Sequence, residues 1–154
     1  MITSNFVQIA ILESMKRIAI LLIFTGLGFW SSAQEIDMKR IDFVKKFHKA
    51  VVAHKQSKVI KLTDKGYRKE QIKFLNGNKE QFVDELFGGI DIHTEEYINV
   101  KLSEIENIEI QDVFDRGNGD WEYVFHVKAG EWLIKRSLFL HQRGKKYGFI
   151  GSQG

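Results

Sequence analysis

The sequence predicts an α+β fold in which N-terminal helices pack on one face of a curved antiparallel sheet. Before Tyr97 the apolar residues recur three and four positions apart, which is the period of a helix; after it they alternate every second position, which is the period of a strand. The connections between the predicted strands are short, which favours antiparallel neighbours. Helices that precede such a run of strands are typical of α+β layering.

Length and composition limit the classes of protein to consider. The chain has 154 residues, of which 44% are hydrophobic and 12% aromatic, enough for one domain with a packed core. The formal charge is +3, and basic and acidic residues are mixed along the chain, so we expect no nucleic-acid surface. The sequence contains no cysteine, which excludes disulfides, thiolate catalysis and cysteine-based zinc sites.

The segment Met15 to Gln34 has the features of a secretory signal peptide. Lys16 and Arg17 form its basic start, an apolar run follows, and the small residues 31–33 precede a predicted cut before Gln34. The apolar run is shorter than the roughly 20 residues that a membrane span needs. An uncleaved N-terminal anchor is the alternative.

From this we expect an exported protein, periplasmic or extracellular. Residues 1–33 would be removed, with residues 1–14 an extension ahead of the true start of translation. Residues 34–154 would then form a single α+β domain that has no membrane attachment after cleavage.

The helical half is predicted as follows. Ile36 to His54 form an amphipathic helix with lysines on its polar side. Ser57 caps a short second helix, Asp64 to Gly66 form a turn, and Gln71 to Leu75 form a brief strand.

A third helix is predicted to begin at Asn78. Gln81 follows three residues later, the spacing of a capping box. Gly88 and Gly89 are expected to close the helix, because glycine accepts the left-handed conformation of a C-terminal cap. The buried stripe of this helix is expected to consist of Phe82, Val83, Leu86 and Phe87.

The second half is predicted to contain four or five strands. A strand begins at Tyr97, a turn or bulge lies near residues 104–107, and residues 116–119 reverse the chain. The central feature is the hairpin Asp120 to Gln142, which turns at Lys128 to Glu131. A last strand carries Tyr147 and Phe149.

This order of elements resembles the nuclear transport factor 2-like superfamily, the cone-shaped fold shared with ketosteroid isomerases and polyketide cyclases. The residues that carry the resemblance match the first two helices, the start of the third helix and the closing hairpin: Phe43 to Ala50 with Val59, Ile60 and Leu62; Asn76 to Phe82; and Lys135 to Leu140 with Lys145 to Phe149. Tyr147 stands where many members have tryptophan. The resemblance implies the fold, and places the chain among secreted members of unknown role.

Function does not follow from that fold, because the superfamily includes isomerases, dehydratases, cyclases and accessory domains. Its isomerases use a pocket aspartate as base and a tyrosine or aspartate as donor to an enolate oxygen. Those residues find no numbered counterpart here. The acids Asp42, Asp84 and Glu85 on the predicted helices are candidate bases only if they face the mouth of the cone.

Two charges stand out in the predicted sheet. Asp112 falls in the apolar row Ile108, Ile110, Phe114, and Arg136 in the apolar row Ile134, Leu138, Leu140. A buried charge is costly unless it is paired. Either the two line a ligand pocket in which Arg136 holds an anionic group, or they form a structural ion pair, or a bulge turns one of them to solvent. The floor of the pocket would be the aromatic side chains of Trp121, Tyr123, Phe125 and Trp132.

Other chemistry has weaker support. The five histidines lack metal-ligand spacing, no nucleophile elbow or phosphate-cradling glycine loop is present, and we expect neither metal nor cofactor.

The leading hypothesis is an exported, non-catalytic domain that binds a small apolar or weakly anionic ligand, or a protein partner. The alternative is an isomerase- or dehydratase-like enzyme that uses a pocket carboxylate. A third possibility is a structural homodimer that pairs through the sheet.

Overall fold

The computed structural model describes residues 38–153. The predicted signal peptide and its cleavage site lie outside this range, as do the first two residues of the predicted N-terminal helix. A helix occupies residues 38–52. The packing described below is that of the compact unit Phe43–Gly154.

Three further helices follow: α2 (Gln56–Lys61), α3 (Lys65–Phe74) and α4 (Lys79–Phe87). Side chains fix the starts of the last two. Asp64 accepts hydrogen bonds from the backbone N–H groups of Gly66 and Tyr67, and Asn78 accepts one from the N–H of Gln81 at 3.0 Å. The predicted cap of α4 is therefore confirmed, and its four predicted core residues are buried.

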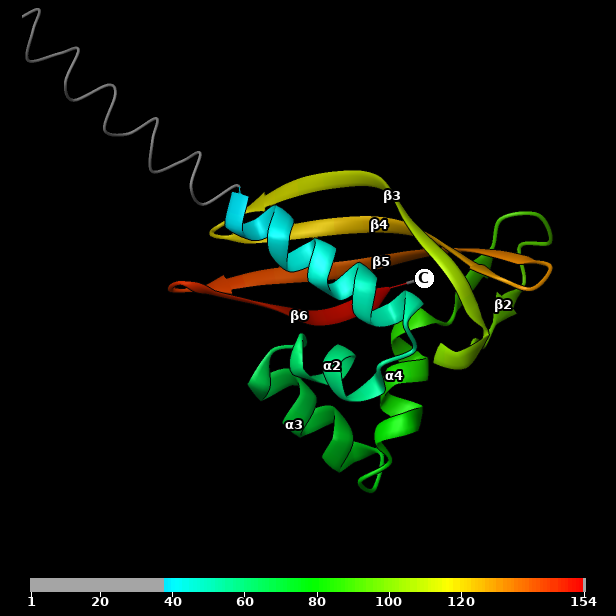
Figure 1. Ribbon diagram of the computed structural model, residues 1–154, viewed down its shortest axis with the longest axis horizontal. Coiled ribbons are helices and arrows are strands. Elements are labelled where there is room, and N and C mark those ends of the chain that lie inside the picture. Colours follow the sequence, from blue (N-terminus) through cyan, green and yellow to red (C-terminus); the bar gives the residue numbers. More distant parts are fainter. Residues whose placement is uncertain (1–37, 154) are drawn as a thin grey trace, which may run out of the picture. The chain divides into compact units, whose positions relative to one another are not determined.

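The sheet has six antiparallel strands: β1 (Gly89–Asp91), β2 (Tyr97–Ile98), β3 (Ile105–Gly117), β4 (Asp120–Ala129), β5 (Trp132–Arg143) and β6 (Lys146–Gln153). The strands are ordered β2-β1-β5-β4-β3, and β6 also pairs with β5 (Figure 1). A short 3-10 helix, η1 (Leu102–Glu104), precedes β3. The long hairpin β4–β5 lies at the centre of the sheet, as predicted, and turns at Gly130.

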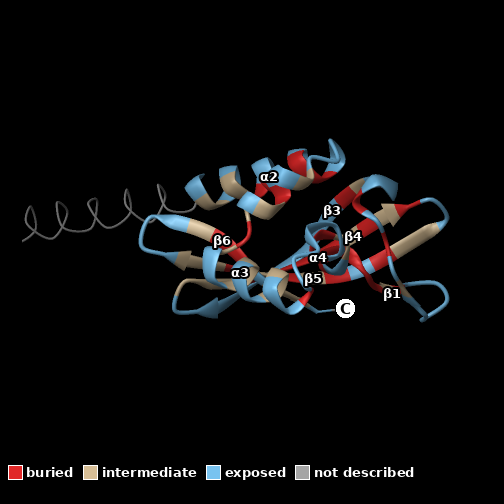
Figure 2. Cartoon of the chain, turned by 90° about the horizontal axis from the view of Figure 1, so that it is seen from below, coloured by how far each residue is buried: buried red, intermediate tan, exposed pale blue. Residues whose placement is uncertain are grey.

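The core lies between this hairpin and the helices, and is made largely of aromatic rings. Phe47 is fully buried, and its ring centroid is 4.4 Å from that of Phe149 and 6.4 Å from that of Phe125. Rings at such distances add to the stability from area burial alone. In Figure 2 the buried residues run along β4 and β5, whereas α3 contains no buried residue.

Four local predictions were wrong. Ser57, expected to cap α2, lies inside that helix, whose N-cap is Lys55. Lys65 and Gly66, expected in a turn, form the start of α3. Residues 71–75, predicted as a strand, belong to α3 and its end, because the Asp64 cap starts a helix that good helix formers continue. Gly88 does not close α4 in a left-handed conformation: its φ is −61° and its ψ 142°, so the chain leaves α4 extended and enters β1 directly. Gly89 is needed for close approach, since a Cβ there would lie 2.7 Å from the Lys135 carbonyl oxygen.

Within residues 38–153 no helix is both long enough and apolar enough to cross a bilayer.

Candidate functional site

Arg136, the charge expected to hold a ligand, closes the end of a helix. It lies on β5 with 7% of its surface exposed. Its Nε donates to the Leu86 carbonyl at 3.0 Å, and its Nη2 donates to the Glu85 carbonyl at 2.8 Å and to the Ser152 hydroxyl. These carbonyls belong to the last turn of α4, where backbone C=O groups have no N–H donor within the helix. Burial lowers the pKa of Arg136, while the nearby Tyr97 and Tyr67 act to raise it.

The structure does not bring Asp112 to Arg136. A register shift between Ile110 and Asp112 places Asp112 opposite Val124, which in turn faces Ser137. Arg136 instead pairs with Phe125, in the row of Ile110. Adjacent positions of a strand point to opposite faces, so Asp112 and Arg136 lie on different faces of the sheet and form neither a shared pocket nor an ion pair. The bulge that we weighed as an alternative is what separates them, and it leaves Asp112 exposed.

The four aromatic residues expected as a pocket floor contribute to the packed core. Tyr123 and Phe125 are buried with ring centroids 6.1 Å apart, and Phe47 covers Phe125. Trp121 packs against Tyr147, with ring centroids 6.1 Å apart, and Trp132 is half-buried against the same core. Of these rings, Phe125 contacts Phe47 of the helix 38–52, whereas Tyr123 and Trp121 contact rings of β6. A ligand-binding role for the four residues stays a prediction.

A pocket of about 590 Å³ opens between the helix 38–52 and α2. This volume lies within the range of known small-molecule sites, about 300–1,000 Å³. Ala50, Ala53 and Leu62 supply its apolar surface. The rest of the lining consists of lysines, and none of the described lining residues is acidic: Lys46, Lys49, Lys55, Lys58 and Lys61.

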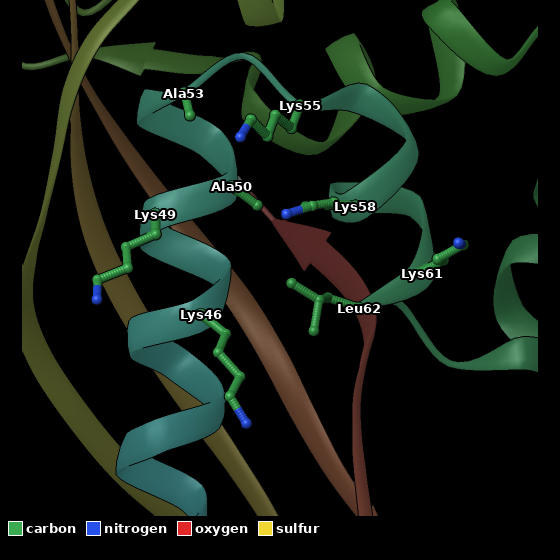
Figure 3. Close-up of a pocket in the computed structure, with 8 residues that line it drawn as sticks. All are labelled: Lys46, Lys49, Ala50, Ala53, Lys55, Lys58, Lys61 and Leu62. Carbon is green, nitrogen blue, oxygen red and sulfur yellow. The ribbon is translucent and has the colours of Figure 1, made fainter.

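The five lysines do not all face the opening. Figure 3 shows Lys55 and Lys58 pointing from the region of α2 toward the helix 38–52. Lys49 and Lys61 point away from the gap, and Lys46 leaves the helix on the side that faces α2. Two lysines thus place positive charge over an apolar surface, an arrangement that suits a ligand with an anionic head and an apolar body.

The pocket belongs to a wider basic region. Residues 43–79 contain 11 basic side chains and only two acidic ones, Asp64 and Glu70, whereas residues 80–153 contain 8 basic and 14 acidic ones. Charge is therefore segregated between the first helices and the rest of the unit. The even mixing inferred from the sequence was wrong at this scale. The 11 basic residues are Lys45, Lys46, Lys49, Lys55, Lys58, Lys61, Lys65, Arg68, Lys69, Lys73 and Lys79.

A second, smaller pocket of about 230 Å³ holds one of the candidate bases. Asp84 lines it together with His54 and Lys101. Burial raises the pKa of Asp84, and Glu80 raises it further, while a hydrogen bond from the Leu102 backbone N–H at 3.0 Å acts in the opposite direction. The second pocket therefore contains a carboxylate of raised pKa, but one that already caps η1.

Other buried acids have structural roles. Asp91 has 1% of its surface exposed and accepts hydrogen bonds from the N–H groups of Leu133, Thr94 and His93 and from the Thr94 hydroxyl. It closes the β1–β2 turn and ties it to β5. Within the described part of the chain no group of three or more histidine and acidic side chains is placed to hold a metal ion.

Sequence reasoning missed the lysine pocket although a signal was present. Lys55, Lys58 and Lys61 recur every three residues, which places them along one side of a short helix. The preceding helix carries Lys46 and Lys49 at the same spacing. What the sequence lacks is the angle between the two helices, which decides whether such rows meet.

Comparison with solved structures finds similarity to an NTF2-like protein of unknown function from Cytophaga hutchinsonii. The two chains are 11% identical, the match covers 74% of this chain and 85% of that chain, and the TM-score is 0.38. This neighbour is of the kind that the sequence resembles, but a likeness at this level carries no argument about function. The predicted α+β class is confirmed by the helices and six-stranded antiparallel sheet themselves. No family model and no curated protein matches the chain.

Proposed function

We propose that this protein is a non-catalytic binding domain for an anionic amphiphile, a molecule with an apolar chain and a carboxylate, sulfate or phosphate head. One observation carries the proposal: the pocket of about 590 Å³ combines an apolar surface with lysines and has no acid among its described lining residues. The apolar chain would supply most of the affinity, at about 0.8 kcal/mol for each buried methylene. The lysines would select the charge of the head.

Selection by charge follows from the positions of Lys55 and Lys58. Both point toward the gap from the region of α2 (Figure 3), so a head group at the opening meets two ammonium groups. A cationic head would be repelled by the same groups, and a neutral head would gain nothing from them. The pocket should therefore rank ligands of equal chain length by their charge.

The test is calorimetric titration with dodecanoate, dodecanol and dodecyltrimethylammonium, each below its micelle concentration. We expect dodecanoate to bind most tightly. Replacing Lys55 and Lys58 together with glutamine should weaken dodecanoate binding by about three- to tenfold, the size expected for two exposed charge interactions. Replacing Lys49 and Lys61 together with glutamine is the matched control, because it removes the same charge from side chains that point away.

Two results would overturn the proposal. One is equal affinity for the anionic and cationic chains. The other is an equal loss in the two double variants, which would mean that general charge, and not the pocket, attracts the ligand.

The second candidate is an isomerase- or dehydratase-like enzyme, and the raised pKa of Asp84 in its pocket favours it. A carboxylate of raised pKa suits proton transfer near neutral pH. The test is conversion of a β,γ-unsaturated ketone to the conjugated isomer, followed by ultraviolet absorbance. Turnover that Asp84→Asn abolishes would support the enzyme, and turnover unchanged in that variant would reject Asp84 as the base.

A further inference from the structure

The most exposed large hydrophobic side chain from residue 43 onward lies within the basic region. Phe74 is 80% exposed and ends α3, where the chain turns toward α4. It is the only strongly exposed aromatic side chain of residues 43–79. A single exposed ring is common on a protein surface, so its role depends on the side chains that accompany it.

The exposed side of α3 carries three lysines, and also Glu70 one turn before Phe74. Lys65, Lys69 and Lys73 recur every four residues, which places them along one side of the helix. All three are exposed, and α3 as a whole buries no residue (Figure 2). Lys79 begins α4 just beyond the turn and is also exposed.

We propose that α3 and the turn after it dock the domain on an anionic lipid bilayer, with Phe74 inserted at the level of the head groups. Aromatic rings favour this interface, where one side is apolar and the other wet. Each lysine near an anionic surface contributes about a fivefold gain in partitioning. The proposal differs from the expectation that the protein has no membrane contact, and it does not depend on the pocket.

A bilayer fits these residues better than a nucleic acid does. Proteins that bind single strands stack successive bases on several aromatic side chains along a basic groove. Here a single exposed ring ends a helix that also exposes three lysines, which suits docking on a lipid surface. The acidic strand β3 of a second copy is another possible partner of the lysines, and the test must separate the three.

The test is co-sedimentation of the full chain with vesicles of phosphatidylcholine alone and of phosphatidylcholine mixed with phosphatidylglycerol. The neutral vesicles measure any binding through the apolar run at residues 18–30. We expect the wild type to bind the anionic vesicles at least tenfold more strongly, and this preference to fall with salt.

Variants locate the surface. Lys69 and Lys73 replaced together with glutamine should lose at least fivefold of the binding to anionic vesicles, and Phe74→Ala at least threefold. Lys145 and Lys146 replaced together with glutamine form the matched control, since these exposed residues lie at the end of the β5–β6 turn and the start of β6 and carry the same charge. Phe114→Ala, at a ring 46% exposed on β3, is the control for Phe74.

Three outcomes would overturn the proposal: equal binding to both vesicle types, equal losses in the α3 variants and their controls, or tighter binding of a single-stranded oligonucleotide through the same lysines. Self-association of the wild type that the Lys69 and Lys73 changes abolish, with no anionic-vesicle preference, would assign these lysines to a second copy instead.

Discussion

The Nε of Arg136 donates to the backbone carbonyl of Leu86 at 3.0 Å, so a charge in the middle of β5 closes the C-terminal end of α4. A cation is favoured there because the carbonyl end of a helix carries partial negative charge. The same guanidinium reaches the Glu85 carbonyl and the Ser152 hydroxyl, and so joins α4, β5 and the end of β6. The interruption in the apolar row of the hairpin thus serves to anchor a helix.

Arg136→Leu should therefore destabilise the fold. The change leaves buried carbonyls of α4 without donors, and each unsatisfied group costs about 1–3 kcal/mol. We expect a loss of about 2–4 kcal/mol in the free energy of unfolding, measured with urea. Arg136→Lys should recover only part of it, because an ammonium cannot reproduce the planar fork. Arg143→Leu, at an exposed arginine of the same strand, is the control and should cost less than about 1 kcal/mol. A loss for Arg136→Leu no larger than for this control would contradict the assigned role.

Acid sensitivity should depend on Asp91. Burial would raise the pKa of this carboxyl, but hydrogen bonds from the N–H groups of Leu133 and Thr94, among others, lower it overall. A depressed folded-state pKa adds stability above the unfolded-state value, about 3.9, and that stability is lost as pH falls through the folded value. Asp91→Asn should therefore be less stable than the wild type near neutral pH, and should show a shallower fall of the urea midpoint below about pH 4. Parallel midpoint curves for the two proteins down to pH 2 would be the contrary result.

The contribution of Asp84 to stability should depend on pH in the opposite direction to that of Asp91. Burial raises its pKa, and Glu80 lies one turn before it on α4. A raised folded-state pKa favours folding below the unfolded-state value, and this advantage is lost as pH rises through the folded value. Asp84→Asn keeps an acceptor for the Leu102 N–H and removes the like-charge pair, so we expect a gain of about 0.3 kcal/mol at pH 7. Thermal unfolding should show the gain shrinking toward pH 3. A loss of stability at pH 7 would mean that the charge itself strengthens the cap of η1.

Local sequence patterns suffice to predict some features of this fold and not others. The cap at Asn78, the buried stripe of α4 and the β4–β5 hairpin were predicted because each depends on residues close together in the chain. The position of Asp112 was not predicted, because one extra residue in β3 moves each following side chain to the opposite face of the sheet. The lysine pocket depends on how two helices meet, and that is set by distant core contacts such as Phe47 with Phe149.

Association through the sheet stays a prediction, and β3 offers the residues for it. Phe114 is 46% exposed, and its row continues through Glu122 to the half-buried Phe139. If two copies pair through this face, sedimentation equilibrium should show a dimer that dissociates at least tenfold more readily in Phe114→Lys, because a charge would be buried at the interface. A single-chain mass at every accessible concentration would reject the dimer.

Two backbone hydrogen bonds hold β6 against the segment before α3. The backbone N–H of Asp64 donates to the Phe149 carbonyl at 2.8 Å, and the N–H of Phe149 donates to the Leu62 carbonyl at 3.1 Å. This pairing brings Gly148 so close that an added Cβ would lie 2.8 Å from the Asp64 nitrogen and 2.9 Å from its Cα. Both are backbone atoms, which cannot rotate away as the end of a flexible side chain would. Any residue larger than glycine must therefore push the two segments apart.

Gly148→Ala should cost about 1–3 kcal/mol in the free energy of unfolding, the usual range for overpacking. Gly151→Ala, three residues later on the same strand, is the control, because a Cβ there meets no atom within 4 Å. The control should be neutral or slightly stabilising, since alanine restricts the unfolded chain more than glycine does. Amide hydrogen exchange would show where the cost arises: faster exchange of Asp64 and Phe149 in Gly148→Ala alone locates it at this contact. Equal unfolding energies for the two variants would show that the segments can separate without loss.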